Sequence, residues 1–245
     1  MDFSNVRERP TYKIYKLLWT GIDWLFPPIC GGCQKPGVRW CSGCQSKTVV
    51  LEPPLCMKCG SVVRVPGICG ACRKSPPHFS ALSSWAEFSG PLRNALHRLK
   101  YQNDLALGET FSKFLIQRLL DLEWEVDLVV PVPLAAGRQA ERGYNQASML
   151  ARPLALASGI EYQPGALLKV RETPSQVGLS IDQRKVNVQN AFSGRTALTA
   201  GKRILIVDDI CTSGATVDAC SEALIQSGAK EIFALTLARA PHVRS

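Results

Sequence analysis

The 245-residue sequence lacks an apolar run long enough to span a membrane, and its N-terminal segment lacks the features of a secretory signal. That segment, MDFSNVRERPTYKIYK, is charged throughout and is followed by neither an apolar core nor a small-residue cleavage site. We therefore expect a cytoplasmic protein with no membrane partner, whose cysteines stay reduced.

Histidine and aromatic residues are scarce, which limits the chemistry that the chain can carry. The three histidines are scattered, without a nucleophile or a metal-ligand pattern around them. Residues 29–75 contain a single aromatic residue, Trp40. Because proteins that bind single strands stack bases on aromatic rings, a stacking platform in this region is weakly supported.

Cysteine, in contrast, is abundant and regularly spaced. Eight of the ten cysteines form four Cys-x-x-Cys pairs, with seven residues between the first two pairs and nine between the last two. This is the layout of two successive four-cysteine zinc ribbons. The predicted ligands of two structural zinc ions are the quartet Cys30, Cys33, Cys41 and Cys44 and the quartet Cys56, Cys59, Cys69 and Cys72.

Two alternatives to this zinc arrangement stay open at the level of sequence. Disulfides would need an oxidising compartment, which the N-terminal segment does not indicate. A crossed arrangement would exchange pairs between the quartets, whereas consecutive pairing is favoured because each quartet closes a short loop. Since no histidine or carboxylate stands at an expected ligand position, both sites are predicted to be closed and structural.

Charge is uneven along the chain. The formal net charge of +9 falls to about +5 once eight thiolates and two zinc ions are counted. Residues 1–80 contain 11 Lys and Arg against 4 Asp and Glu, whereas residues 81–245 contain 18 against 16. We therefore expect any binding of single-stranded DNA to be weak, dependent on salt and centred on residues 1–80.

Residues 204–216 read ILIVDDICTSGAT and are the most informative stretch. The four apolar residues predict a strand buried on both faces of a parallel sheet, ending at Asp208 and Asp209. A hydroxyl-rich turn follows, and then a helix that closes on Gly228. Strands and helices alternate over residues 81–239, which predicts an α/β fold with a mostly parallel, twisted sheet and helices on both faces.

The turn after this strand has the parts needed to hold a phosphorylated sugar. N–H groups at the start of a helix bind anions, and glycine lets the backbone approach a phosphate closely. The carboxylates would repel a phosphate, so they suit ribose hydroxyls or a hydrated Mg²⁺. Because they are expected to face a cleft, we predict that they support no core contact. The predicted phosphate loop comprises Thr212, Ser213, Gly214, Ala215 and Thr216.

Two polar segments, residues 131–146 and 171–190, are candidates to complete the site. Arg138 and Arg142 in the first segment are suited to a diphosphate, because planar guanidinium groups bind it with two hydrogen bonds. The second segment is predicted to be a polar loop, long enough to close over a bound ligand. Lys100 is a weaker candidate.

Residues 12–26 are predicted to form a short amphipathic helix. Its apolar stripe is expected to pack within the molecule rather than on a membrane. The stripe comprises Ile14, Leu18, Ile22 and Leu25.

Residues 204–216 resemble the phosphoribosyl diphosphate (PRPP) signature of type I phosphoribosyltransferases, which is apolar residues, two acidic residues and then T-[ST]-G-x-T. Further motifs extend the likeness, and from about residue 25 to 239 the chain is similar to the ComF/GntX family. These motifs are LFPPIC, GPLRNALHRLKY, VVPVPL, RGYNQA, T-x-x-Q-x-x-L at Thr173, Gln176 and Leu179, and R-x-x-N at Arg184 and Asn187.

The resemblance implies a double zinc ribbon fused to a type I phosphoribosyltransferase fold, and a bacterial role in natural competence or the use of incoming DNA. The implied parts are an N-terminal helical segment (1–28), the double zinc ribbon (29–75) and a phosphoribosyltransferase-like domain (79–245). It also implies that Asp208 and Asp209 are the acidic pair, and that residues 212–216 bind the 5′-phosphate.

Two functions from different classes follow from the sequence. An enzyme would bind Mg²⁺–PRPP and displace diphosphate from C1 of the ribose with a nitrogen nucleophile. A non-catalytic module would sense PRPP or a nucleotide, while its zinc ribbons bind single-stranded DNA or a competence helicase. Product formation by the purified protein would distinguish the two.

Overall fold

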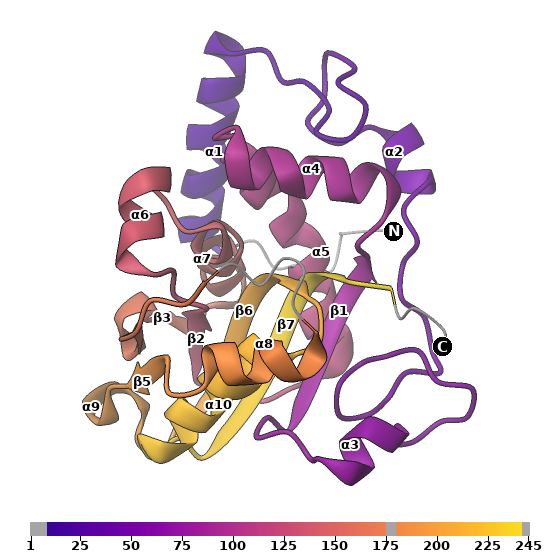
Figure 1. The fold of residues 1–245 in the computed structure, drawn as a ribbon. Helices are drawn as coiled ribbons and strands as arrows, with labels where there is room; N and C mark the ends of the chain where they lie inside the picture. The colour runs from indigo at the N-terminus through magenta and orange to yellow at the C-terminus, as the bar shows by residue number, and fades with distance from the viewer. Residues whose placement is uncertain (1–8, 175–179, 242–245) are drawn as a thin grey trace.

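The computed structural model describes residues 9–174 and 180–241 (Figure 1). The N-terminal part contains α1 (Pro10–Leu25) and two cysteine-rich ribbons with the short helices α2 (Ser42–Ser46) and α3 (Gly70–Lys74). The elements that follow the ribbons are β1 (Ala81–Glu87), α4 (Gly90–Tyr101), α5 (Ala106–Leu122), β2 (Leu128–Pro131), α6 (Ala136–Arg142), α7 (Gln146–Ser158), β3 (Glu161–Tyr162) and the 3-10 helix η1 (Pro164–Ala166). The remaining elements are β4 (Leu167–Lys169), α8 (Ile181–Val188), β5 (Phe192–Gly194), α9 (Thr196–Thr199), β6 (Arg203–Cys211), α10 (Ala215–Gln226) and β7 (Glu231–Arg239).

The core is a five-stranded parallel sheet in the order β1-β7-β6-β2-β3. Along the central strand β6, Leu205 and Val207 pack toward α5 and α7, whereas Ile204 and Ile206 pack toward α10 (Figure 1). Side chains of a strand alternate between faces, so a strand covered on both sides must be apolar at every position. This confirms the predicted α/β fold.

Strand β6 is longer than the sequence suggested. It continues through Asp208 and Asp209 to Cys211, because its backbone stays paired with β7 as far as Arg239. The expectation that the strand ends at the acidic pair is therefore wrong. The two carboxylates lie within the strand and point to its opposite faces.

The segment predicted as a polar loop also contains regular structure. Helix α8 begins at a capping box, in which Ser180 and Gln183 satisfy each other's backbone N–H groups. Strands β4 and β5 form a small antiparallel sheet on either side of this segment. The motif residues Gln176 and Leu179 lie outside the described residues.

Backbone hydrogen bonds join the double ribbon to the edge strand β1, so the connection is more than a covalent linker. Between the two ribbons, Val50 forms an antiparallel bridge with Ala86, and the Leu51 N–H donates to the Trp85 carbonyl at 2.9 Å. In the second ribbon, the Lys58 carbonyl accepts from Leu82 N–H at 2.7 Å. The proposed limits of the domains stay a prediction, but these hydrogen bonds join the predicted ribbon part (29–75) to the predicted phosphoribosyltransferase-like part (79–245).

Helix α1 packs with a different face from the expected one. Tyr12 is buried in the core, and Tyr15 and Trp19 continue its face in ring-to-ring contact. Three residues of the predicted stripe are exposed instead, by 61% at Ile14, 64% at Leu18 and 41% at Ile22, so the expectation that the stripe packs internally is wrong for them. Aromatic side chains each bury a large apolar area, which favours packing of this face.

The helices of the described part of the chain are all too short or too polar to cross a bilayer.

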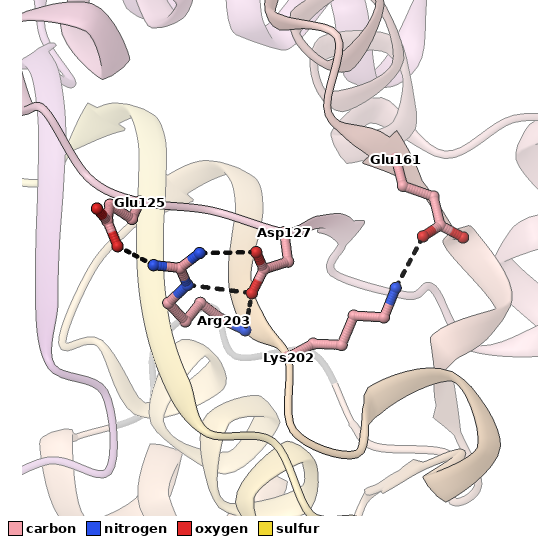
Figure 2. Close-up of polar contacts among 5 residues, drawn as sticks. All are labelled: Glu125, Asp127, Glu161, Lys202 and Arg203. Atoms are coloured by element: carbon pink, nitrogen blue, oxygen red, sulfur yellow. Dashed lines mark hydrogen bonds and ion pairs between the residues drawn. The ribbon is translucent and has the colours of Figure 1, made fainter.

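Charged residues join the amino ends of three strands (Figure 2). Arg203, the first residue of β6, donates to both carboxylate oxygens of Asp127, which precedes β2, at 2.8 and 3.1 Å. Lys202 forms an ion pair of 2.9 Å with Glu161 of β3. Hydrogen bonds from the Arg203 side chain and backbone hold the pKa of Asp127 well below its usual value. These pairs fix the register of the strands at the end of the sheet away from the candidate site.

Candidate functional site

The predicted phosphate loop forms an open backbone turn at the start of α10. Gly214 has φ +84° at the N-cap position, and a Cβ added there would meet no atom within 4 Å. The Ala215 N–H donates to Ser213 Oγ at 3.4 Å. Helix α10 ends as predicted, with Gly228 at φ +90° and its N–H on the Ile225 carbonyl. The loop thus presents a left-handed glycine, hydroxyls and a helix N-terminus on one side of the sheet.

The acidic pair precedes this loop. Asp208 Oδ1 accepts a hydrogen bond of 2.9 Å from the Asp209 backbone N–H. Burial, and then the neighbouring Asp209 carboxylate, raise the pKa of Asp208 well above its usual value. A ligand that supplies a proton, a hydroxyl donor or a cation would stabilise such a buried carboxylate.

Asp209 already has a cationic partner. Lys100, in the last turn of α4, lies 2.7 Å from Asp209 Oδ2. Burial lowers the pKa of Lys100, but attraction to the carboxylates outweighs it and raises the pKa, so the amine stays charged. The expectation that the pair supports no core contact is therefore wrong for Asp209. Sequence reasoning ranked this lysine below the arginines, because its neighbourhood in the sequence carries no signal that α4 ends against β6.

Arg138 and Arg142 lie on α6, a short helix in the segment that follows β2. Arg138 donates to the Thr173 carbonyl at 3.1 Å, and the Arg142 guanidinium lies 5.3 Å from the centre of the Tyr101 ring. Tyr101 directly follows Lys100, so α6 and the end of α4 are neighbours. Within the described residues no hydrogen bond or ion pair joins either arginine to the acidic pair. Their contact with diphosphate stays a prediction.

Lys169 is a further basic residue that sequence reasoning missed. Its amine donates to Thr173 Oγ1 at 2.7 Å, while Arg138 donates to the carbonyl of the same residue. Two cations therefore hold the start of the segment that was predicted to close over a ligand. Arg171 donates to the Asn187 and Gln189 carbonyls at 3.0 and 2.6 Å and so joins the segment's two ends.

The eight paired cysteines form two clusters, in the predicted consecutive quartets. In each cluster the four sulfur atoms lie within 4.8 Å of one another, so the crossed alternative is wrong. The distances between sulfurs are 3.6 Å for Cys30 and Cys44, 3.7 Å for Cys33 and Cys41 and 3.8 Å for Cys59 and Cys69. A tetrahedron with Zn–S bonds of about 2.3 Å has edges of about 3.8 Å, so both clusters fit zinc.

In both clusters a backbone N–H group points at a cysteine sulfur. The Cys41 N–H lies 3.4 Å from Cys30 Sγ, and the Cys69 N–H lies 3.3 Å from Cys56 Sγ. Burial raises the pKa of Cys30, but backbone hydrogen bonds outweigh it and lower the pKa to about 6, and the same balance holds for Cys56. In the same clusters burial raises the pKa of Cys44 and Cys72, so each cluster has at least one thiol that ionises readily and one that does not. Thiolates are the form that binds zinc.

Two family models match the chain. Residues 21–73 match the double zinc ribbon domain, and residues 101–245 match the phosphoribosyl transferase domain. The second match covers more than half of the chain, and together with the cysteine clusters it supports structural zinc and a type I phosphoribosyltransferase fold.

Relatives extend over both parts. The chain is 31% identical over 223 residues to the DNA utilization protein YhgH of Salmonella typhimurium, covering 87% of this chain and 97% of the relative. It is 33% identical over 208 residues to competence protein F of Haemophilus influenzae, covering 82% and 90%. It is 31% identical over 152 residues to competence protein ComFC of Streptococcus pneumoniae, covering 62% and 65%. The chain therefore belongs to the ComF family, in which a double zinc ribbon precedes a phosphoribosyltransferase domain.

Proposed function

We propose that the protein binds PRPP with Mg²⁺ at the carboxyl end of β6. The observation that carries the proposal is the proximity in sequence and space of two features. One is the pair of neighbouring carboxylates, with the raised pKa of Asp208, and the other is the open, left-handed backbone at Gly214. The first suits a sugar, and the second suits a phosphate.

The 5′-phosphate would lie at the start of α10. The backbone N–H groups of a first helical turn point outward without intrahelical partners, and the helix dipole favours negative charge there. The hydroxyls of Thr212, Ser213 and Thr216 add donors around the same anion. Any side chain at position 214 would project into this space, which is why glycine suits it.

The ribose would lie against the acidic pair. Asp208 and Asp209 accept hydrogen bonds from its hydroxyls, and their charge favours the positive ribosyl centre that develops as the C1–O bond lengthens. Magnesium bound to the diphosphate would neutralise part of the charge of the leaving group. Arg138 and Arg142 would bind the same diphosphate from α6.

We propose transfer of the 5-phosphoribosyl group as the reaction. The C1–O bond to diphosphate breaks, diphosphate leaves with the bonding electrons, and a nitrogen nucleophile forms the new bond to C1 and loses its proton. The sensing alternative uses the same pocket without breaking this bond. A nitrogen base would be the acceptor.

Calorimetric titration with Mg²⁺–PRPP tests the binding site. Asp208→Asn combined with Asp209→Asn should weaken binding at least about a hundredfold, since each charge-assisted hydrogen bond contributes roughly 1.5–3 kcal/mol. Asp127→Asn is the matched control, because it removes a carboxylate at the opposite end of the sheet. Equal PRPP affinity in the wild type and the double variant would refute the site.

Transfer is then tested by incubation with Mg²⁺–PRPP and a panel of bases and DNA. Release of diphosphate, detected by mass spectrometry, together with a phosphoribosylated product would establish the enzyme. Tight binding without product across the panel would favour the sensor.

Handling of single-stranded DNA is a second candidate function, motivated by the relatives that carry DNA utilization and competence in their names. Lys35 and Lys47 lie on the first ribbon, where they line the same hollow as the zinc-ligating Cys33, Cys41 and Cys44. We propose weak binding of single strands there, with a competence helicase as the alternative partner. Replacing both lysines with Met should reduce the dependence of affinity on salt, whereas Lys230→Met should not. Affinity that is independent of salt in the wild type would contradict the proposal.

A further inference from the structure

Arg239, the last residue of β7, lies buried between the second zinc ribbon and the strand that leads into the phosphate loop. Only 5% of the residue is exposed. Its guanidinium donates to the Cys59 carbonyl at 2.6 Å and to Ser61 Oγ at 2.7 Å. The same group lies 3.5 Å from Cys211 Sγ. One side chain therefore contacts both the second cysteine cluster and β6.

A buried guanidinium needs an opposite charge nearby. Within residues 9–174 and 180–241, Arg239 forms no ion pair with a carboxylate. Burial of an unpaired charge is strongly unfavourable. Four thiolates around one Zn²⁺ carry a net charge of about −2, so the second cluster with its metal supplies the missing counter-charge.

Ser61 links this arginine to a zinc-ligating sulfur. Arginine has donors only, so the Ser61 oxygen must accept from Arg239. Ser61 Oγ also lies 3.1 Å from Cys59 Sγ, where its hydroxyl hydrogen can be donated to the thiolate. Hydrogen bonds to metal-bound ligands orient them and tune their affinity for the metal.

The second ribbon also supports the phosphate loop. Cys211 is the register partner of Arg239 across β6 and β7, and the next residue along the chain is Thr212 of the loop. The His78 N–H, just after the second ribbon, donates to Asp218 in the first turn of α10 at 2.7 Å. The first ribbon packs elsewhere, with the Gly32 carbonyl accepting from Asn94 of α4.

We propose that Arg239 is a positioning residue that couples the second zinc cluster to the phosphate loop. Zinc in the quartet that contains Cys59 and PRPP at residues 212–216 then strengthen each other's binding, while zinc in the first quartet does not take part. Linkage requires the effect to be reciprocal. The loop half of the proposal rests on the proposed function; the zinc half does not.

The experiment follows release of zinc from the full-length protein to a chromophoric chelator. The wild type should release two zinc ions per chain, and Arg239→Met should speed release of one of them roughly tenfold to a hundredfold. Arg118→Met is the matched control, because Arg118 is a partly buried arginine that, like Arg239, donates to a serine hydroxyl (Ser83, at 2.8 Å). Cadmium-113 NMR of the substituted protein should show a shift in only one of two signals.

Saturating Mg²⁺–PRPP should slow release of that same zinc from the wild type, which tests the coupling without any substitution. Arg239→Met should also weaken PRPP binding, and Arg239→Lys should restore it in part. Unchanged zinc release in Arg239→Met would overturn the proposal whatever the result with PRPP. A wild type that binds PRPP with an affinity unaffected by Arg239→Met would overturn the coupling alone. A wild type that binds no PRPP would overturn the coupling together with the proposed function.

Discussion

At its amino end β6 begins with Arg203, which donates to both oxygens of Asp127, while near its carboxyl end Lys100 pairs with Asp209 and Asp208 accepts only from the Asp209 backbone N–H among the hydrogen bonds found in the described residues. The pKa of Asp127 is lowered, whereas the pKa of Asp208 is raised. Charges that are satisfied within the protein fix the register of strands. Like charges that lie close together reduce stability, and a ligand that brings a cation or a hydrogen-bond donor can relieve this repulsion.

Two glycines that flank β6 allow the two ends of the strand to be compared directly. Gly201 before β6 and Gly214 after it have φ of +71° and +84°, and an added Cβ would meet no atom within 4 Å at either. Backbone conformation and space are thus alike at both positions. What differs is the proposed phosphate beside Gly214.

Substitution of both glycines separates strain from ligand binding and should give the largest effect. Gly214→Val and Gly201→Val should each lose roughly 1–2 kcal/mol of stability, because a side chain is strained at positive φ. Only Gly214→Val should also reduce PRPP affinity, by about a hundredfold or more, since its branched side chain would occupy the space of the 5′-phosphate. Thermal unfolding and calorimetric titration measure the two effects. Similar loss of PRPP affinity in both variants would mean that strain alone explains the result.

Removal of a lysine from each end tests which ion pair is needed for stability. Lys100→Met leaves buried carboxylates without their cation and should cost about 3 kcal/mol at pH 7. Lys202→Met breaks the more exposed pair with Glu161 and should change stability much less. Chemical denaturation gives both values. Asp209→Asn should recover part of the loss in the Lys100→Met background, and strictly additive losses would show that the two groups do not interact.

Much of this contrast is readable from sequence, but unevenly. The apolar run before Asp208 identified a central parallel strand, and the cysteine spacing gave both quartets, because each depends on local periodicity or spacing. The position of the acidic pair inside β6 was missed, since the end of a strand depends on how far its neighbour β7 continues.

Contacts between residues far apart in the sequence were the main features that the sequence did not predict. Lys100 and Asp209 are separated by more than a hundred positions, and nothing in either neighbourhood indicates that α4 ends against β6. Arg239 closes an apolar strand and meets a ribbon at the other end of the sequence. The exposed stripe of α1 shows the same limit, because two apolar faces competed for the core and only the tertiary contacts of Tyr12 decide between them.

The pH dependence of stability should have opposite signs at the two ends of β6, although the effects are the smallest. Stability changes with pH in proportion to the difference in protons bound by the unfolded and folded states. At Asp208 the folded pKa lies above the unfolded value of about 4, so the folded state holds the extra proton and stability falls as pH rises from about 4. At Asp127 the folded pKa lies below that value, so its contribution is complete above about pH 4 and is lost as pH falls through the folded pKa. Asp208→Asn should therefore gain stability relative to the wild type between about pH 4 and pH 7, whereas Asp127→Asn should be slightly less stable at pH 7 and approach the wild type toward about pH 3. Differences in melting temperature between each variant and the wild type across this range measure both, because loss of zinc in acid affects all three proteins alike. Two parallel profiles would contradict the assigned directions.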